Sequence, residues 1–406
     1  MAMKKSSILA MALLTAGSAL AQQQLVKEVE REMKSKPESY PDLIEKLKPA
    51  FTNEETAKDA HTWITAGKGA TGYFDNQQVK IQLGDNNVDK KAVGHALLDG
   101  FGYLTTVFTV DTVVDAKGKI KTKYSKEAAN QLRDHYNDLT NAAVYLWDKE
   151  DYDGAVKAWQ LYVDARTNPI FKDKVKTIPD SIYGEIYYNM GIGNSLTQNH
   201  ENALQAFKNA ISNGYTKKNA FDYGISAAAQ LKNSAEMAAL AEMAYPLYGA
   251  EDARYIGYIV NNYIEQKQFQ EASDMLDQYL QADPDNSQLY YIKGVLADAM
   301  GNQDMLMQSY RKAIELDPKN SQALLQLGYQ ICKQADAIDE AEGGGLSNED
   351  YKALRTNKID PLYREAAGLL EQAYAENNDL DDARRLLRGI YYKLNDEENL
   401  KRVEAM

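Results

Sequence analysis

A period of 34 residues in the second half of the chain restricts its fold more than any other feature. One position of this period, held by a small or apolar residue, recurs in steps of 34, 35, 34 and 34 at Gly191, Ile225, Val260, Gly294 and Gly328. A second such position recurs at Ala210, Ala244, Tyr279 and Ala313. A unit of this length cannot bury its apolar face alone, so neighbouring units must stack. We therefore expect a stack of antiparallel helix hairpins.

The pattern resembles the tetratricopeptide repeat (TPR), a helix-turn-helix unit of about 34 residues. In the register of that family, Gly294, Tyr310, Ala313 and Pro318 match positions 8, 24, 27 and 32. The resemblance covers most of the chain from 59 to 394. It implies an all-α TPR solenoid, a right-handed superhelix of antiparallel hairpins, with an irregular N-terminal part and a C-terminal capping helix pair.

Together with the composition of the N-terminus, these matches predict five segments along the chain. They are a signal peptide at 1–21, irregular N-terminal TPR-like hairpins at 22–126, a regular TPR array at 127–320, an interrupted TPR unit at 321–379 with an insertion at 336–360, and C-terminal capping helices at 380–406. The insertion contains Gly343-Gly344-Gly345 and is expected to project as a loop. The polar stretch around Lys117-Gly118 predicts a short hairpin.

The N-terminus has the layout of a secretory signal peptide. Lys4 and Lys5 precede an apolar run, and Ala19-Leu20-Ala21 provides the small residues of a cleavage site. No cysteine follows that site, so a lipid anchor is not expected, and no later stretch has the length of a membrane helix. The overall plan is similar to exported TPR proteins of Gram-negative envelopes. This resemblance predicts a periplasmic protein, with outer-membrane association or secretion as alternatives.

Composition excludes several functions. The net charge is −13 without a basic stripe, so the surface repels phosphate backbones and nucleic acid is not an expected partner. With a single cysteine, Cys332, the chain cannot form an internal disulfide, and a buried inert thiol is expected. The four histidines, at 61, 95, 135 and 200, are scattered and match no metal-binding spacing. The glycines from Gly67 to Gly72 lack the spacing of a phosphate loop. We predict no catalytic residue, no metal, no cofactor and no enzymatic activity.

A binding function uses the residues more specifically. The resemblance implies a concave groove lined by positions 2, 5, 9 and 12 of each first helix, which lie on one stripe. The candidate contacts for a protein or peptide partner are Trp147, Tyr188, Asn261, Tyr291, Val295, Asp298 and Tyr329. Of the residues with which TPR domains clamp a carboxylate, only Asn261 is present, so aromatic anchoring is expected instead.

Two alternatives remain at this point. A helical-repeat component that binds glycans or nutrients would stack sugars on Trp147 and the tyrosines. For any single tyrosine, packing between helices is the more common role. The sequence specifies neither the identity of the partner nor the oligomeric state.

Overall fold

The computed structural model of the chain describes residues 20–114, 118 and 120–405. It divides into two compact units, unit 1 (Met1–Leu231) and unit 2 (Lys232–Met406). Every regular element in the described residues is helical except one pair of two-residue strands. These are β1 (Val113–Val114) and β2 (Ile120–Lys121), which pair antiparallel around Gly118 at a φ of 75°. The predicted all-α class and the short hairpin are both confirmed.

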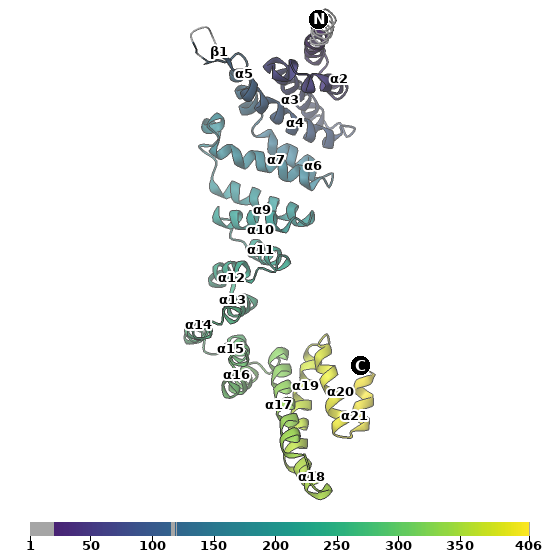
Figure 1. Cartoon of the computed structure of the whole chain (residues 1–406), viewed down its shortest axis with the longest axis vertical. Helices are drawn as coiled ribbons and strands as arrows, with labels where there is room; N and C mark the ends of the chain where they lie inside the picture. The colour runs from purple at the N-terminus through teal and green to yellow at the C-terminus, as the bar shows by residue number, and fades with distance from the viewer. Residues whose placement is uncertain (1–19, 115–117, 119, 406) are drawn as a thin grey trace, which may run out of the picture. The chain divides into compact units, whose positions relative to one another are not determined.

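Unit 1 consists of antiparallel helix hairpins, and Figure 1 shows α6 with α7 and α9 with α10 as successive pairs. Residues 20–35 are helical as well. The other elements are η1 (Pro37–Ser39), α2 (Tyr40–Thr52), η2 (Thr56–Lys58), α3 (Ala60–Gln82), α4 (Lys90–Val110), α5 (Ser125–Asp134), α6 (Asp138–Trp147), α7 (Tyr152–Asp164), η3 (Ala165–Thr167), η4 (Pro169–Phe171), α8 (Lys172–Val175), α9 (Asp180–Leu196), α10 (His200–Ser212) and α11 (Lys218–Gln230).

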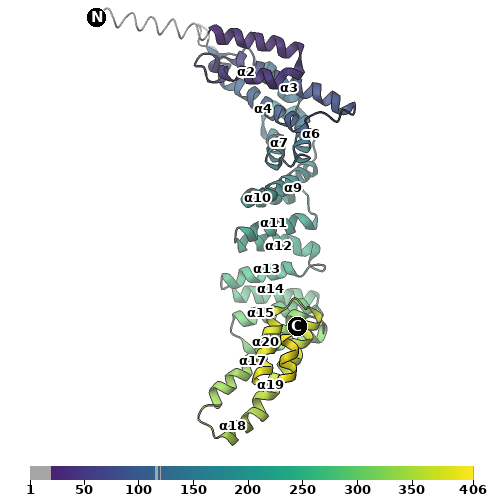
Figure 2. The ribbon, with the colours of Figure 1, turned by 90° about the vertical axis from the view of Figure 1, so that its right-hand side faces the viewer.

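Unit 2 continues with helices of similar length, and Figure 2 shows α13 and α14 running side by side. Its elements are α12 (Ser234–Tyr248), α13 (Arg254–Glu265), α14 (Phe269–Ala282), α15 (Ser287–Ala299), α16 (Gln303–Leu316), α17 (Ser321–Glu342), α18 (Asn348–Leu354), the π-helical turn η5 (Arg355–Ile359), α19 (Asp360–Glu376), α20 (Asp381–Lys393) and α21 (Glu397–Glu404).

Several turns inside the hairpins share one arrangement. A residue with positive φ follows the end of the first helix, and the next residue is the N-cap of the second helix. At Gly301 the φ is 69°, the amide of Asn302 donates to the Ala297 carbonyl at 2.9 Å, and the Asn302 side chain accepts from the Met305 amide at 3.1 Å. These bonds satisfy backbone groups that both helix ends would otherwise leave unpaired. The same pairing of a positive-φ residue with a capping Asp or Asn occurs at 150–151, 198–199 and 395–396.

Glycines at the first repeat position allow close packing. A Cβ on Gly294 would lie 2.3 Å from Tyr310, and one on Gly191 would lie 2.6 Å from Phe207. A Cβ on Gly328 would likewise lie too close to the Leu370 side chain, and a Cβ on Gly67 too close to the Leu104 side chain. The prediction that these glycines serve packing is confirmed.

The insertion at 336–360 is helical, so the predicted loop is wrong. α17 continues to Glu342, the three glycines form a turn, and α18 and η5 return the chain to α19 (Figure 1). Apolar side chains explain this, because Ile338 and Tyr351 pack on the core of unit 2 and Ile359 is fully buried. The glycine run was more visible in the sequence than this helical spacing of apolar residues.

The predicted signal peptide falls mainly on residues 1–19, which lie outside the described residues. Residues 20 and 21, the last two of the prediction, are part of the helix at 20–35. In the described part of the chain, no helix combines the length and apolarity required to cross a bilayer.

Candidate functional site

The predicted contact residues fall in both units. Trp147 ends α6 and Tyr188 lies in α9, both in unit 1. The remaining five, Asn261, Tyr291, Val295, Asp298 and Tyr329, lie on α13, α15 and α17 of unit 2.

In unit 1, both predicted aromatic anchors are engaged in packing. The half-buried ring of Trp147 lies 4.9 Å from that of Tyr152 and 5.6 Å from that of Trp159, measured between centroids. The ring of Tyr188 stacks on Tyr215 at 4.6 Å, and its hydroxyl accepts from the Asn219 side chain at 2.7 Å. Burial raises the pKa of Tyr188. These contacts leave each ring only partly accessible to a ligand.

In unit 2, four of the predicted residues lie on α15 and α17, and we call this set the α15–α17 face: Tyr291, Val295, Asp298 and Tyr329. The first three are four and three residues apart and therefore share one side of α15. Tyr291 is half-buried and lies 5.9 Å from the ring of Tyr310, whereas Asp298 is exposed. Tyr329 is 40% exposed, and the Lys333 ammonium lies 5.6 Å from its ring centroid.

A buried amide joins the two helices of this face. The Gln330 side chain, only 2% exposed, donates to Asp298 at 3.4 Å. Sequence reasoning missed Gln330, since a glutamine next to a predicted contact carries no distinguishing signal. Asn261 is exposed on α13 and has no part in this contact.

A second candidate site, which the sequence did not predict, is a hollow of about 330 Å³ in unit 1. We call it the N-terminal pocket. Three elements line it: the helix at 20–35 with Pro37, the first half of α3, and the start of α5. The lining residues are Glu30, Met33, Lys34, Pro37, His61, Ile64, Thr65, Lys68, Gly69, Gly72, Tyr124 and Glu127.

The α3 wall follows from its sequence. The Asp59 side chain caps the helix by accepting from the His61 amide at 2.9 Å. His61, Thr65, Lys68 and Gly72 then recur three or four residues apart, so they share one face. Glycine permits the close approach of the first helix, because a Cβ on Gly69 would lie 2.2 Å from the Met33 sulfur.

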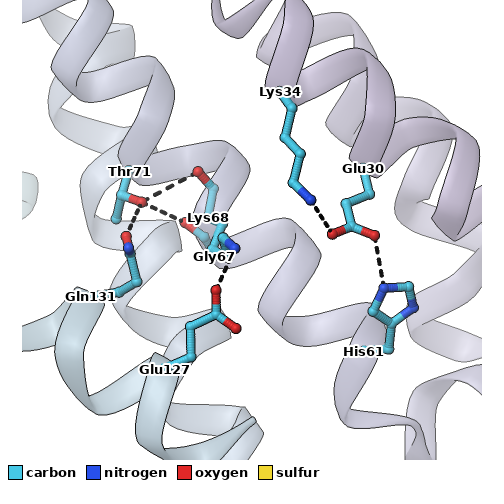
Figure 3. A network of polar contacts seen from close by, with 8 residues as sticks. All are labelled: Glu30, Lys34, His61, Gly67, Lys68, Thr71, Glu127 and Gln131. Atoms are coloured by element: carbon cyan, nitrogen blue, oxygen red, sulfur yellow. Dashed lines mark hydrogen bonds and ion pairs between the residues drawn. The ribbon is translucent and has the colours of Figure 1, made fainter.

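Ion pairs connect the walls (Figure 3). Glu30 accepts from Lys34 at 2.8 Å and from His61 Nε2 at 2.9 Å, and Lys68 pairs with Glu127. Burial opposes ionisation of Glu30, but the hydrogen bonds from Lys34 and His61 keep its pKa below the usual value. The pKa of Lys34 is raised, mainly by Glu30 and with a contribution from Glu127.

Asp111 fixes the α5 wall. Its carboxylate is 3% exposed and accepts from the amides of Lys123, Tyr124 and Ser125 at 3.0, 2.7 and 2.7 Å. Although burial acts in the opposite direction, these bonds lower the pKa of Asp111. The Tyr124 ring thereby stacks on His61 with centroids 5.7 Å apart. Beside the pocket, Thr71 donates to Gln131 at 2.9 Å and ties α3 to α5 (Figure 3).

The histidines are less isolated than the sequence suggested. His61 pairs with Glu30, and His95 Nε2 lies 2.7 Å from Asp151. His135 is 7% exposed, and its Nε2 lies 3.2 Å from Asp75. Burial lowers the pKa of His135, but the bonds to Asp75 and to the Gln131 carbonyl outweigh it, so the pKa is raised.

His135 also belongs to a group of three residues with potential metal ligands. Ligand atoms of Asp75, His135 and Asp138 all lie within 4.8 Å of one another. Because His135 Nε2 is engaged by Asp75, an ion pair accounts for this arrangement. Cys332 is buried, which raises the pKa of its thiol, as the prediction of an inert cysteine requires.

Two family models, both described as tetratricopeptide repeat, match residues 287–320 and 309–342. Residues 287–342 are tetratricopeptide repeats. The α15–α17 face lies entirely within this TPR segment, and the packing of Gly294 on Tyr310 is part of its hairpin. The predicted all-α TPR solenoid class is thus confirmed.

One curated relative is similar over a short stretch. It is the probable biofilm formation methyltransferase WspC of Pseudomonas putida, 33% identical over 67 residues. The match covers 16% of this chain and 16% of that protein, so the name of the whole protein describes WspC and not this chain.

Several solved structures are similar to parts of this chain. A TPR repeats protein from Bacteroides fragilis is 16% identical with a TM-score of 0.34, covering 64% of this chain and 98% of its own. The C-terminal part of a TPR repeat-containing protein from Cytophaga hutchinsonii is 15% identical with a TM-score of 0.38, and the match covers 71% of this chain and 99% of that one. YrrB, described as a TPR protein with an unusual peptide-binding site, is 19% identical with a TM-score of 0.30, and the match covers 49% of this chain and 87% of that one. At this level the similarity carries no argument about a ligand.

Proposed function

We propose that the chain is a non-enzymatic scaffold of the cell envelope that binds a protein or peptide on its α15–α17 face. TPR proteins are generally protein-binding scaffolds. The observation that supports this face most directly is Tyr329, whose ring is 40% exposed on a helix of the TPR segment. A tyrosine of this kind offers a partner an apolar ring and a polar hydroxyl together.

The surroundings of Tyr329 suit a preformed binding surface. Tyr291 is held on Tyr310, and the bond between Gln330 and Asp298 joins α15 to α17. A partner would therefore meet side chains that are already ordered, which lowers the entropic cost of association. Asp298 and Lys333 provide charges of both signs at the edge of the aromatic contact, where they favour a polar segment with an apolar anchor.

A capture experiment with matched tyrosine variants tests this function. Envelope extract would be passed over the immobilised protein, its Tyr329→Ala variant and a Tyr392→Ala control. Tyr392 is 74% exposed on α20, outside the α15–α17 face. We expect a partner retained by the parent and by Tyr392→Ala but lost with Tyr329→Ala. Equal retention by both variants would exclude this face.

The glycan alternative can be tested on the same protein. Stacking of sugars would require a free face on Trp147, whose ring already contacts Tyr152 and Trp159. Stabilisation of the parent by oligosaccharides, lost on Trp147→Phe, would favour that function over partner binding.

Export to the periplasm is the part of the proposal that rests on sequence alone. The arrangement from Lys4 to Ala21 supports it. N-terminal sequencing of the protein from a periplasmic fraction should start at Gln22. Retention of Met1 to Ala21 on the accumulated protein would contradict cleavage.

A further inference from the structure

The N-terminal pocket contains a buried hydroxyl that the protein leaves without a partner. Thr65 is 3% exposed, and its Oγ1 has no hydrogen-bond partner although the residue lines the hollow. A buried polar group without a partner costs about 1–3 kcal/mol. Among the residues that line the pocket, Thr65 is the one whose buried side chain has hydrogen-bonding capacity that the protein leaves unused.

The walls of the pocket carry two lysine ammonium groups and two glutamate carboxylates, so these four charges sum to zero. Lys34 and Lys68 carry ammonium groups and Glu30 and Glu127 carry carboxylates, and Lys34 pairs with Glu30 and Lys68 with Glu127. The ammonium of a lysine has three donors and a carboxylate has about four acceptor sites, so these pairs retain capacity for a ligand. A phosphate or another polyanion would upset this balance. A ligand that carries one charge of each sign would preserve it.

The remaining lining is apolar and the space is small. Met33 is buried, Ile64 is 3% exposed, and Pro37 lies beside them in the lining. A volume of 330 Å³ is at the lower end of the range for small-molecule pockets, about 300–1,000 Å³. These features favour a compact ligand with one apolar substituent.

We propose that the N-terminal pocket binds a zwitterion of the α-amino-acid type with an apolar side chain. The ligand carboxylate would accept from Lys34, Lys68 and the Thr65 hydroxyl, while its ammonium would donate to Glu30 and Glu127. The side chain would lie on Met33 and Ile64. This site is independent of the α15–α17 face and of the partner proposed there.

Calorimetric titration with defined probes tests the chemistry of the ligand. L-Leucine and L-methionine are the probes, and leucinamide and N-acetyl-leucine each lack one of the two charges. We expect saturable binding of the amino acids and at least ten-fold weaker binding of both derivatives, because each leaves one set of charged wall groups uncompensated. Equal binding of the derivatives, or no binding of either amino acid, would overturn the proposal.

A pair of threonine variants tests the position of the ligand. Thr62 lies on the same helix, and its hydroxyl is also buried and without a partner, but it does not line the pocket. Thr65→Val should weaken leucine binding about ten-fold through loss of one charge-assisted hydrogen bond. Thr62→Val should leave the Kd unchanged. Equal effects of the two variants would show that the Thr65 hydroxyl does not contact the ligand.

Filling the pocket provides a test that does not depend on polar groups. Gly72 lines the pocket in the middle of α3, and a Cβ there would meet nothing within 4 Å. Gly72→Leu should therefore abolish leucine binding while the thermal midpoint is retained, since leucine is a better helix former than glycine. Full binding by this folded variant would place the ligand elsewhere.

Discussion

Between residues 20 and 138, side chains far apart in the sequence are joined by ion pairs and buried hydrogen bonds, whereas the TPR segment at 287–342 is joined mainly by apolar contacts around glycine. His61 with Glu30 and His135 with Asp75 are separated by 31 and 60 residues. The contact between Gly294 and Tyr310 instead lies within one hairpin and has a counterpart at Gly191 and Phe207. A repeated contact can be recognised from its period, but a single ion pair between distant residues leaves no local pattern.

The largest expected effect on stability comes from removing a buried polar contact in the N-terminal region, and it should exceed the effect of removing a polar contact in the TPR segment. Asp111→Ala should lower the free energy of unfolding by about 3 kcal/mol, because three backbone amides lose their acceptor. Asp298→Ala, which removes a 3.4 Å bond on an exposed side chain, should cost about 1 kcal/mol or less. Urea unfolding followed by circular dichroism measures both. Equal costs would remove the distinction between the regions.

Asp111 also predicts a dependence on acid. Its pKa is lowered in the folded state, so the carboxylate stabilises the fold above its usual pKa of 3.8 and this contribution is lost as the pH falls through the folded value. The difference in stability between parent and Asp111→Asn should therefore shrink below pH 3.8. A constant difference down to pH 2 would contradict this assignment.

Glycine substitutions test a property that the two regions should share, namely close helix packing at a glycine. Gly67→Ala and Gly294→Ala should each cost about 2 kcal/mol, since the new Cβ would lie 2.6 Å from Leu104 and 2.3 Å from Tyr310. Gly368→Ala is the matched control, because it lies in α19 with nothing within 4 Å of its Cβ and should gain about 0.5–1 kcal/mol. A neutral Gly67→Ala would mean that the repeat register does not extend to α3.

His135 gives a smaller and opposite dependence on pH. Its pKa is raised, so protonated His135 stabilises the fold below the usual value of 6.5, and this contribution is lost as the pH rises through the folded pKa. His135→Gln should therefore lower the free energy of unfolding more at pH 5.5 than at pH 8.5. Asp75→Asn should suppress this difference in a double-variant cycle. A pH-independent cost would exclude the ion pair.

The smallest effect on stability is expected on the α15–α17 face. Tyr329→Ala should change the free energy of unfolding by no more than about 0.5 kcal/mol, like Tyr392→Ala, because both rings are exposed. Thermal unfolding of both variants provides this comparison. A large loss for Tyr329→Ala alone would make the tyrosine a packing residue.

Sequence reasoning succeeded where contacts repeat. Gly294, Tyr310 and Ala313 were placed as packing residues from their spacing, and all three are buried in the structure. It failed where a short run of loop-forming residues was easier to recognise than apolar residues spread along a helix. The glycines at 343–345 indicated a loop at 336–360, although Ile338, Tyr351 and Ile359 provide the apolar contacts of a helical segment.

The candidate sites were predicted unevenly for the same reason. The register assigned Tyr291 and Tyr329 to one surface, but it could not distinguish the exposed Tyr329 from Tyr188, which stacks on Tyr215. The N-terminal pocket was missed because its walls come from three separate elements. Thr65 in the sequence is one threonine among many, and only its burial without a partner distinguishes it.

The turns inside the hairpins provide a route to a more robust protein. Gly301 takes its positive φ without steric cost, whereas Gln198, Lys267 and Asn395 adopt φ values of 60°, 58° and 52° with a Cβ present. A side chain in this conformation costs about 1 kcal/mol. Glycine at these three positions, none of which belongs to the α15–α17 face or lines the N-terminal pocket, would remove that cost. Thermostability and recognition could then be engineered separately in one chain.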